Sequence, residues 1–196
     1  MDTLIFATNN ENKVREIRHA LNNQFHIISL KEAGILVDIP EPHDTLEDNA
    51  REKSLVIHQL TGKDCFSEDT GLEVEALDGS PGVLSARYAG PEQNASKNME
   101  KLLSALEGIT NRKARFRTVI SLIYHGKEYQ FEGICPGVIL DKKQGEQGFG
   151  YDPLFIPDGA GKSFADMSME EKNTYSHRKK ATAKLAEFLM TRHGKN

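Results

Sequence analysis

Apolar segments with two different spacings alternate along the first part of the chain. Short continuous apolar runs at residues 3–7 and 25–30 are typical of buried strands. Each run is followed by a segment whose apolar residues recur at helical spacing, residues 13–21 and 46–60. Strands that alternate with helices predict a mixed α/β fold in which helices cover a sheet.

The rest of the chain adds a hairpin and more helices. Residues 114–124 and 129–134 flank a short polar turn and predict a β-hairpin. We expect Pro136 and Gly137 to break its second arm, which residues 138–140 could continue after a bulge. Residues 94–106 carry the apolar stripe of a core helix. A capping-box pattern spans residues 168–171, and residues 176–192 predict a last helix. Since no repeat or linker divides the chain, we expect residues 1–196 to form a single domain.

Composition limits the classes of function. A length of 196 residues suffices for one well-cored domain or for two lobes sharing a sheet. The formal charge of -4 gives no electrostatic reason to expect nucleic-acid binding. Cys65 and Cys135 lack the spacing of a metal site and are expected to be buried thiols of a cytosolic protein. No signal peptide is evident, and no apolar run approaches the roughly 20 residues that cross a bilayer. We therefore expect a cytoplasmic protein with no membrane partner.

Two adjacent acids, Glu68 and Asp69, follow a short apolar run, and Thr70 and Gly71 are expected to turn the chain sharply away. Paired acids at the end of a strand predict a divalent-cation site, because Mg²⁺ binds through one or two carboxylates plus the phosphates of a substrate. A solvated acidic turn is the alternative explanation.

A polar loop joins the first predicted strand to the first predicted helix. Its residues are Thr8, Asn9, Asn10, Glu11 and Asn12. The free backbone N–H groups of the helix start, and the positive end of its dipole, would point into this loop, where an anion can sit. Lys13 adds a full positive charge. An asparagine-rich cap beside a solvated lysine explains this segment equally well.

Glycines flank aromatic residues later in the chain, in the order Gly145, Gly148, Phe149, Gly150, Tyr151 and Asp152. Such glycines permit close approach of a ligand, and an exposed phenylalanine suits a flat ring. A tight turn between strands is the alternative explanation.

Basic residues on predicted helices are further candidates. Lys53 lies off the apolar stripe of the segment 46–60 and could contact a phosphate. Lys172 precedes the last helix, while His177 and Arg178 lie in its first turn and would face the preceding loops. A solvated helix face is the alternative interpretation of these basic residues.

Taken together, these motifs resemble the inosine triphosphate pyrophosphatase family, which hydrolyses non-standard purine nucleoside triphosphates. The matching residues occur in family order along the whole chain: Thr8-Asn9-Asn10 with Lys13 and Glu16, Ser67 to Leu72, Pro81-Gly82 with Ser85 to Tyr88, Gly148 to Pro153, and Glu171-Lys172-Asn173 with Ser176-His177-Arg178. Each motif is common alone, but their joint order is specific.

The resemblance implies an elongated mixed β-sheet flanked by helices, with two lobes, an active-site cleft between them and usually a homodimer. It also implies Mg²⁺-dependent hydrolysis of ITP, dITP and XTP to monophosphate and pyrophosphate, which cleanses the nucleotide pool. Asp69 matches the catalytic residue and a metal ligand, and Glu41 matches a second metal ligand. The implied substrate-binding residues are Thr8, Asn9, Asn10, Glu11, Asn12, Lys13, Thr70, Phe149, Gly150, Tyr151, Asp152, Lys172, His177 and Arg178.

The chain departs from many family members at Asn9, Asp48, Glu68 and Thr70, where residues of the same chemical type or turn preference occur. These departures bear on substrate ranking rather than on the reaction. Two other classes stay open. One is a related pyrophosphatase that prefers modified pyrimidine nucleotides. The other is a non-catalytic nucleotide-binding protein, against which the complete set of acids and lysines argues.

Overall fold

The computed structural model describes residues 3–21 and 24–193, which belong to two compact units. The first unit lies within residues 1–69, 118–133 and 178–196, and the second within residues 70–117 and 134–177. The single domain, the elongated shape and the cleft expected from the sequence stay predictions.

The strands form one mixed sheet. They are β1 (Thr3–Phe6), β2 (His26–Ser29), β3 (Cys65–Val74), β4 (Pro81–Gly82), β5 (Lys113–Tyr124), β6 (Lys127–Ile139) and β7 (Phe155–Pro157). Their order is β2-β1-β3-β5-β6-β7, with β4 paired to β3. β1 pairs in parallel with β2 and β3, whereas β3–β4 and β6–β7 are antiparallel. The predicted mixed α/β class is confirmed.

The helices begin at polar caps that were partly foreseeable. They are α1 (Glu11–Ala20), α2 (Leu46–Thr61), α3 (Ala95–Ala105), α4 (Met169–Tyr175) and α5 (His177–His193), with 3-10 turns at Glu75–Leu77, Ser85–Arg87, Asp152–Leu154 and Phe164–Asp166. Ser168 and Glu171 form the predicted capping box of α4. α1 begins two residues before the predicted position 13, because the Asn10 side chain caps it.

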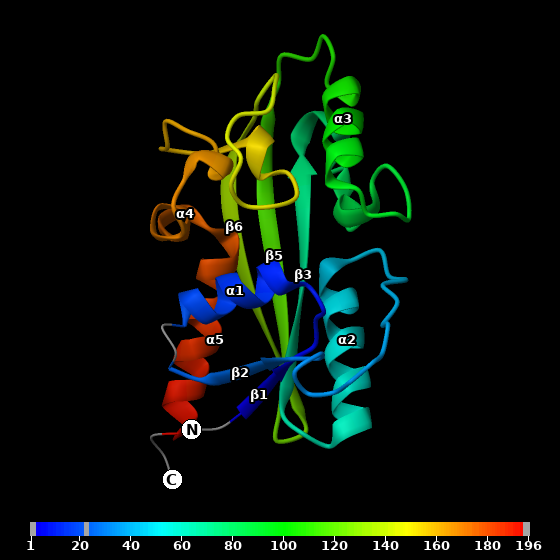
Figure 1. Cartoon of the computed structure of the whole chain (residues 1–196), viewed down its shortest axis with the longest axis vertical. Coiled ribbons are helices and arrows are strands. Elements are labelled where there is room, and N and C mark those ends of the chain that lie inside the picture. The colour runs from blue at the N-terminus through cyan, green and yellow to red at the C-terminus, as the bar shows by residue number, and fades with distance from the viewer. Residues whose placement is uncertain (1–2, 22–23, 194–196) are drawn as a thin grey trace. The chain divides into compact units, whose positions relative to one another are not determined.

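The first unit packs helices against both faces of its strands. Successive residues of β1 point to opposite faces. Phe6 packs with Ile17 of α1 and Leu185 of α5, whereas Ile5 packs with Ile57 of α2. Figure 1 accordingly shows α5 and α2 on opposite sides of β1 and β2. The residues that follow β1 therefore leave a strand that helices cover on both faces.

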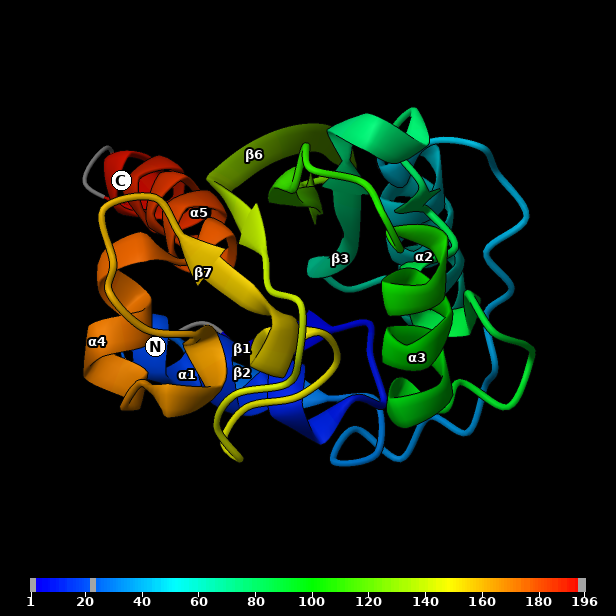
Figure 2. The ribbon, with the colours of Figure 1, turned by 90° about the horizontal axis from the view of Figure 1, so that it is seen from above.

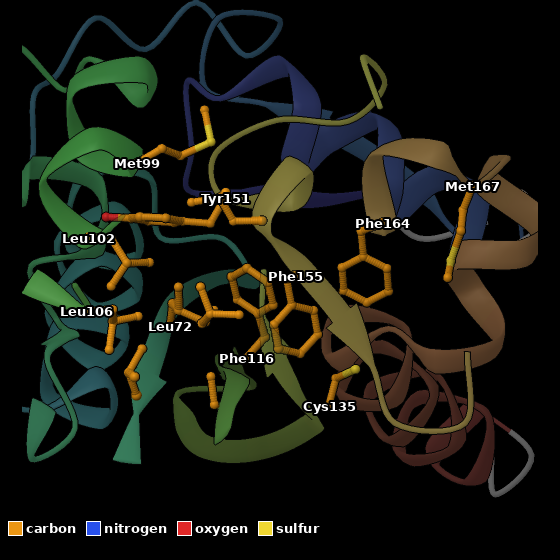
Figure 3. Packing of buried hydrophobic residues seen from close by; sticks show 14 residues of the cluster. Leu72, Met99, Leu102, Leu106, Phe116, Cys135, Tyr151, Phe155, Phe164 and Met167 are labelled. Carbon is orange, nitrogen blue, oxygen red and sulfur yellow. The ribbon is translucent and has the colours of Figure 1, made fainter. Parts of the chain in front are cut away.

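The second unit has its own hydrophobic core. Figure 2 shows α3 and α4 on opposite sides of β7. Phe116 of β5 meets Phe155 of β7 edge to face, with ring centroids 4.7 Å apart. In Figure 3, Tyr151 extends toward Met99 and Leu102 of α3. The Tyr151 hydroxyl donates a hydrogen bond of 2.7 Å to the Ser85 carbonyl oxygen, which secures the glycine loop, residues 145–152, to this core.

The sharp turn predicted at Thr70 and Gly71 is wrong, because β3 continues through both residues to Val74. Gly71 serves close packing instead. A Cβ atom there would lie 2.7 Å from the Gly82 carbonyl oxygen, on the strand β4 that pairs with β3.

The break predicted at Pro136 and Gly137 is also wrong, since β6 continues to Ile139. Gly137 pairs with Pro157 of β7, and the Asp158 N–H donates to the Pro136 carbonyl at 2.9 Å. Proline lacks only the N–H donor, so its carbonyl oxygen can still accept a hydrogen bond from the neighbouring segment.

Both cysteines are free and buried, as predicted. Burial raises the pKa of the Cys65 thiol to about 12. Within the described ranges, no helix combines the length and apolar character needed to cross a membrane.

Gly71→Ala is expected to destabilise the protein by about 1–3 kcal/mol, because overpacking against backbone forces the strands apart. Gly161→Ala is the matched control, since a Cβ there meets no atom within 4 Å. Its free energy of unfolding should stay within about 1 kcal/mol of the wild type. Urea denaturation measures both variants, and equal stabilities would contradict the packing role of Gly71.

Candidate functional site

A cluster of three acids and two lysines lies in the first unit, and we call it the acidic centre: Glu41, Glu68, Asp69, Lys13 and Lys53. The Lys53 ammonium is 2.5 Å from Glu41 Oε1 and 3.2 Å from Asp69 Oδ1. It also donates to the Glu68 carbonyl oxygen at 2.8 Å. Lys13 Nζ lies 3.0 Å from Glu68 Oε1. The sequence-predicted residues Lys13, Lys53, Asp69 and Glu41 are thus brought together.

Alternation along β3 places Asp69 against α2. Cys65, Ser67 and Asp69 share one face of the strand. The Cys65 thiol contacts the Ser54 carbonyl at 3.2 Å, and the Ser67 hydroxyl donates to the Ala50 carbonyl. These two bonds hold α2 along the strand, so Lys53 of the same helix meets Asp69.

Glu68 points to the other face, where it meets a buried arginine. Arg178 of α5 donates through Nε to Glu68 Oε2 at 2.7 Å and through Nη2 to Oε1 at 2.9 Å. Its Nη1 pairs with Glu16 of α1. Arg178, Glu68 and Glu16 are each at most 4% exposed. Such a two-pronged pair fixes the carboxylate in orientation as well as in charge.

The surroundings shift the pKa values of the acids in opposite directions. Burial opposes ionisation of Glu68, but Arg178 and Lys13 outweigh it and hold the pKa of Glu68 well below its usual range. Burial raises the pKa of Asp69 above its ordinary value, with Lys53 opposing this shift and Glu41 adding to it. Asp69 is therefore the more basic of the two neighbouring carboxylates.

The acidic centre suits a divalent cation whose remaining coordination positions are filled by a bound ligand. Asp69 Oδ2 is buried and has no hydrogen-bond partner among the residues that the structure describes. In the same residues no group of three or more metal-ligating side chains is found. Two carboxylates, Asp69 and Glu41, nevertheless match Mg²⁺, which usually keeps waters and takes its remaining ligands from substrate phosphates.

The polar loop before α1 is held by its own side chains. Asn10 Oδ1 accepts from the N–H groups of Asn12 and Lys13, at 3.0 and 3.2 Å. Thr8 Oγ1 accepts from the Asn10 N–H at 3.1 Å. Asn9 and Glu11 are exposed. Two of the helix N–H groups expected to be free are thus already bonded, while the Lys13 side chain pairs with Glu68 within the acidic centre.

The glycine loop lies in the second unit, where Asp152 organises it. Asp152 Oδ2 is 2.6 Å from Lys172 Nζ and accepts from the Phe149 N–H at 3.0 Å. A Cβ on Gly148 would lie 2.1 Å from the same oxygen, so only glycine fits beside it. The Lys172 ammonium lies 5.3 Å from the centroid of the Phe149 ring. Phe149, Asp152 and Lys172 thus form a second group of predicted residues.

The remaining predicted residues of the second unit differ in exposure. The His177 ring stacks on Phe116, with centroids 4.7 Å apart, and is 3% exposed. Tyr151 is 5% exposed, and burial together with Tyr88 raises the pKa of its hydroxyl. Thr70 and Gly150 are half-buried.

The sequence interpretation gave Glu16 no role, although it belonged to a recognised motif. A signal was available: Lys13, Glu16 and Ala20 recur at spacings of three and four residues, which places them on one face of α1. An acid on a face that also carries buried Ile17 and Ala20 indicates a buried cationic partner.

Comparisons with curated sequences point to one family. The protein-family model described as the Ham1 family matches residues 4–188. A dITP/XTP pyrophosphatase of Porphyromonas gingivalis is 54% identical over 192 residues, which cover 97% of this chain and 98% of that protein. A dITP/XTP pyrophosphatase of Flavobacterium johnsoniae is 50% identical over 186 residues, covering 95% and 97%.

Solved structures agree with the sequence matches. The Ham1 protein of Staphylococcus aureus has a TM-score of 0.87 and 38% identity, and the match covers 97% of this chain and 100% of that chain. A structure titled nucleoside-triphosphatase / dITP/XTP pyrophosphatase from Mycobacterium abscessus has a TM-score of 0.76 and 35% identity, covering 94% and 98%. The family resemblance read from the motifs is confirmed, and the chain belongs to the Ham1 family.

Proposed function

We propose that this protein hydrolyses the non-standard purine nucleoside triphosphates dITP, XTP and ITP to the monophosphate and pyrophosphate. The observation that carries the proposal is the acidic centre, where a basic buried carboxylate lies among lysines. Support comes from relatives that are about half identical over nearly the whole chain and are named dITP/XTP pyrophosphatases.

Asp69 is the proposed general base. The reaction forms a bond between a water oxygen and the α-phosphorus, and breaks the bond from that phosphorus to the departing pyrophosphate. A carboxylate orients the attacking water and accepts its proton. Asp69 suits this role because one of its oxygens is engaged by Lys53 while the other is unbonded within the described residues.

Cations of the chain are proposed to hold the triphosphate. Lys13, which directly follows the loop of residues 8–12, and Lys53 carry the charge in the first unit. Asp69 and Glu41 would hold Mg²⁺, which, when bound, supplies charge neutralisation at the phosphate oxygens. Phosphoryl transfer depends mainly on such positioning and charge stabilisation.

The second unit is proposed to recognise the base. Phe149 offers a half-buried ring for stacking on the purine, and Asp152 fixes the backbone of that residue. Hypoxanthine and xanthine carry a 6-oxo group where adenine has an amino group, so hydrogen-bond donors near Lys172 and His177 would favour them. An analogue that leaves buried donors of the site unpaired can be rejected by as much as ~10⁴-fold.

Arg178, predicted to contact substrate, is proposed instead to position the acidic centre. Its Nε and Nη2 groups bond Glu68, and Glu68 in turn bonds Lys13.

A cytoplasmic homodimer with a small-molecule substrate, without nucleic acid or membrane partners, is proposed on the family resemblance.

The proposed function is tested by pyrophosphate release from dITP, XTP, ITP, ATP, GTP and a 5-modified dUTP, each with and without Mg²⁺. We expect dITP and XTP to exceed ATP by at least ~10²-fold in kcat/KM, because adenine lacks the 6-oxo acceptor. Higher turnover of the modified pyrimidine would favour the alternative pyrophosphatase. Tight binding without pyrophosphate release would favour a binding protein.

Asp69→Asn should lower kcat by at least ~10²-fold, because an amide cannot accept the proton of the attacking water. The thermal unfolding midpoint should stay within a few degrees of the wild type, since Glu41 still pairs with Lys53. Asp158→Asn, at an exposed position, is the matched control and should retain full activity. Near-normal turnover by Asp69→Asn would remove the assignment.

Arg178→Met should lower the free energy of unfolding by roughly 3–5 kcal/mol, because it removes the buried guanidinium that pairs with both Glu16 and Glu68. Arg178→Lys keeps the charge but loses the two-pronged contact, so its stability should be intermediate. Urea denaturation with both variants decides the point. Wild-type stability of Arg178→Met, combined with altered base preference, would return Arg178 to the base site.

A further inference from the structure

The Lys53 ammonium group is surrounded by oxygen atoms that resemble the ligand set of a hard cation. Its Nζ atom contacts Glu41 Oε1 at 2.5 Å, the Glu68 carbonyl oxygen at 2.8 Å and Asp69 Oδ1 at 3.2 Å. An ammonium group has three N–H donors, and here each has an acceptor. Carboxylate and backbone carbonyl oxygens are also the ligands that Mg²⁺ and Ca²⁺ take.

We propose that Lys53 is the resident counter-ion of the acidic centre, and that a divalent cation competes with its ammonium group for Glu41 and Asp69. The proposal deepens the proposed function and rests on it. It concerns the protein without nucleotide, in which the two carboxylates are held by a side chain of the chain itself.

Burial is the reason that a counter-ion is needed. The Asp69 side chain is 7% exposed and that of Glu41 25% exposed, while the Lys53 side chain is 9% exposed. Like charges in such surroundings repel strongly unless a cation lies between them. Lys53 reduces the charge that a metal ion would meet, so metal binding by the free protein is weak.

Asp69 offers one position that the lysine leaves open. Its Oδ2 atom is buried and makes no hydrogen bond within the described part of the chain. A divalent cation that bound both carboxylates would compete with Lys53 for Glu41 Oε1 and Asp69 Oδ1, and phosphates of a nucleotide would supply the acceptors that a displaced ammonium lacks. Metal and nucleotide are therefore expected to bind with positive coupling.

The test compares Mg²⁺ binding by the wild type and Lys53→Met in the absence of nucleotide. Isothermal titration calorimetry should show Mg²⁺ binding at least ~10-fold more tightly to the variant, because the competing charge is gone. Thermal unfolding at constant ionic strength is the second readout. Without Mg²⁺ the variant should melt several degrees below the wild type, and about 10 mM Mg²⁺ should recover most of that loss through linkage.

Two controls separate charge from side-chain loss. Lys53→Arg keeps a cation beside Glu41 and Asp69 and should bind Mg²⁺ as weakly as the wild type. Lys63→Met removes an exposed lysine and should change neither readout. If Lys53→Met fails to fold even with Mg²⁺, Lys53→Gln, whose amide can still donate to a carboxylate, takes its place with the same expectations.

Equal Mg²⁺ affinities of the wild type and the neutral variant would overturn the proposal, as would an unfolding midpoint of the variant that ignores Mg²⁺. Pyrophosphate release by the wild type is measured separately. Hydrolysis of dITP together with equal metal affinities would refute the counter-ion role alone. Absence of dITP hydrolysis by the wild type would refute the proposed function itself.

Discussion

Charge compensation around β3 governs the first unit. Glu68 and Asp69 are neighbours in the strand, so their side chains point to opposite faces of the sheet. Arg178 and Lys13 pair with Glu68 on the face covered by α1 and α5, and Lys53 pairs with Asp69 on the face covered by α2. A buried carboxylate without its cation is strongly destabilising. The packing of three helices therefore depends on these pairs as much as on apolar contacts.

Local rules accounted for much of the fold. The capping box at Ser168 was predicted from the sequence because a capping side chain bonds N–H groups only a few residues away. The turn predicted at Gly71 failed because the same residue type serves two needs, unusual backbone angles and close approach of a neighbouring strand. Only the partner, Gly82 of β4, shows which need applies, and strand pairing over that distance is not written in local composition.

The candidate site was foreseen in its members but not in their mutual contacts. Lys53 and Asp69 were singled out separately, and their contact depends on how α2 lies along β3, through Ser67 and Cys65. Asp152 was predicted to bind substrate, which stays a prediction, and within the protein it bonds Lys172 and the Phe149 N–H. Motif resemblance marks which residues matter. It does not distinguish a side chain that meets the ligand from one that holds its neighbour.

The cap of α1 adds a filter on the kind of ligand this loop admits. The Asn10 side chain already accepts from the Asn12 and Lys13 N–H groups. An incoming oxygen atom must therefore win these donors from a neutral amide that is covalently tethered beside them. An ionised acceptor forms hydrogen bonds roughly twice as strong as a neutral one, so a phosphate oxygen competes with this cap better than a sugar hydroxyl does. For the proposed triphosphate site, the cap therefore selects by charge and favours nucleotides over uncharged nucleosides, whatever base they carry.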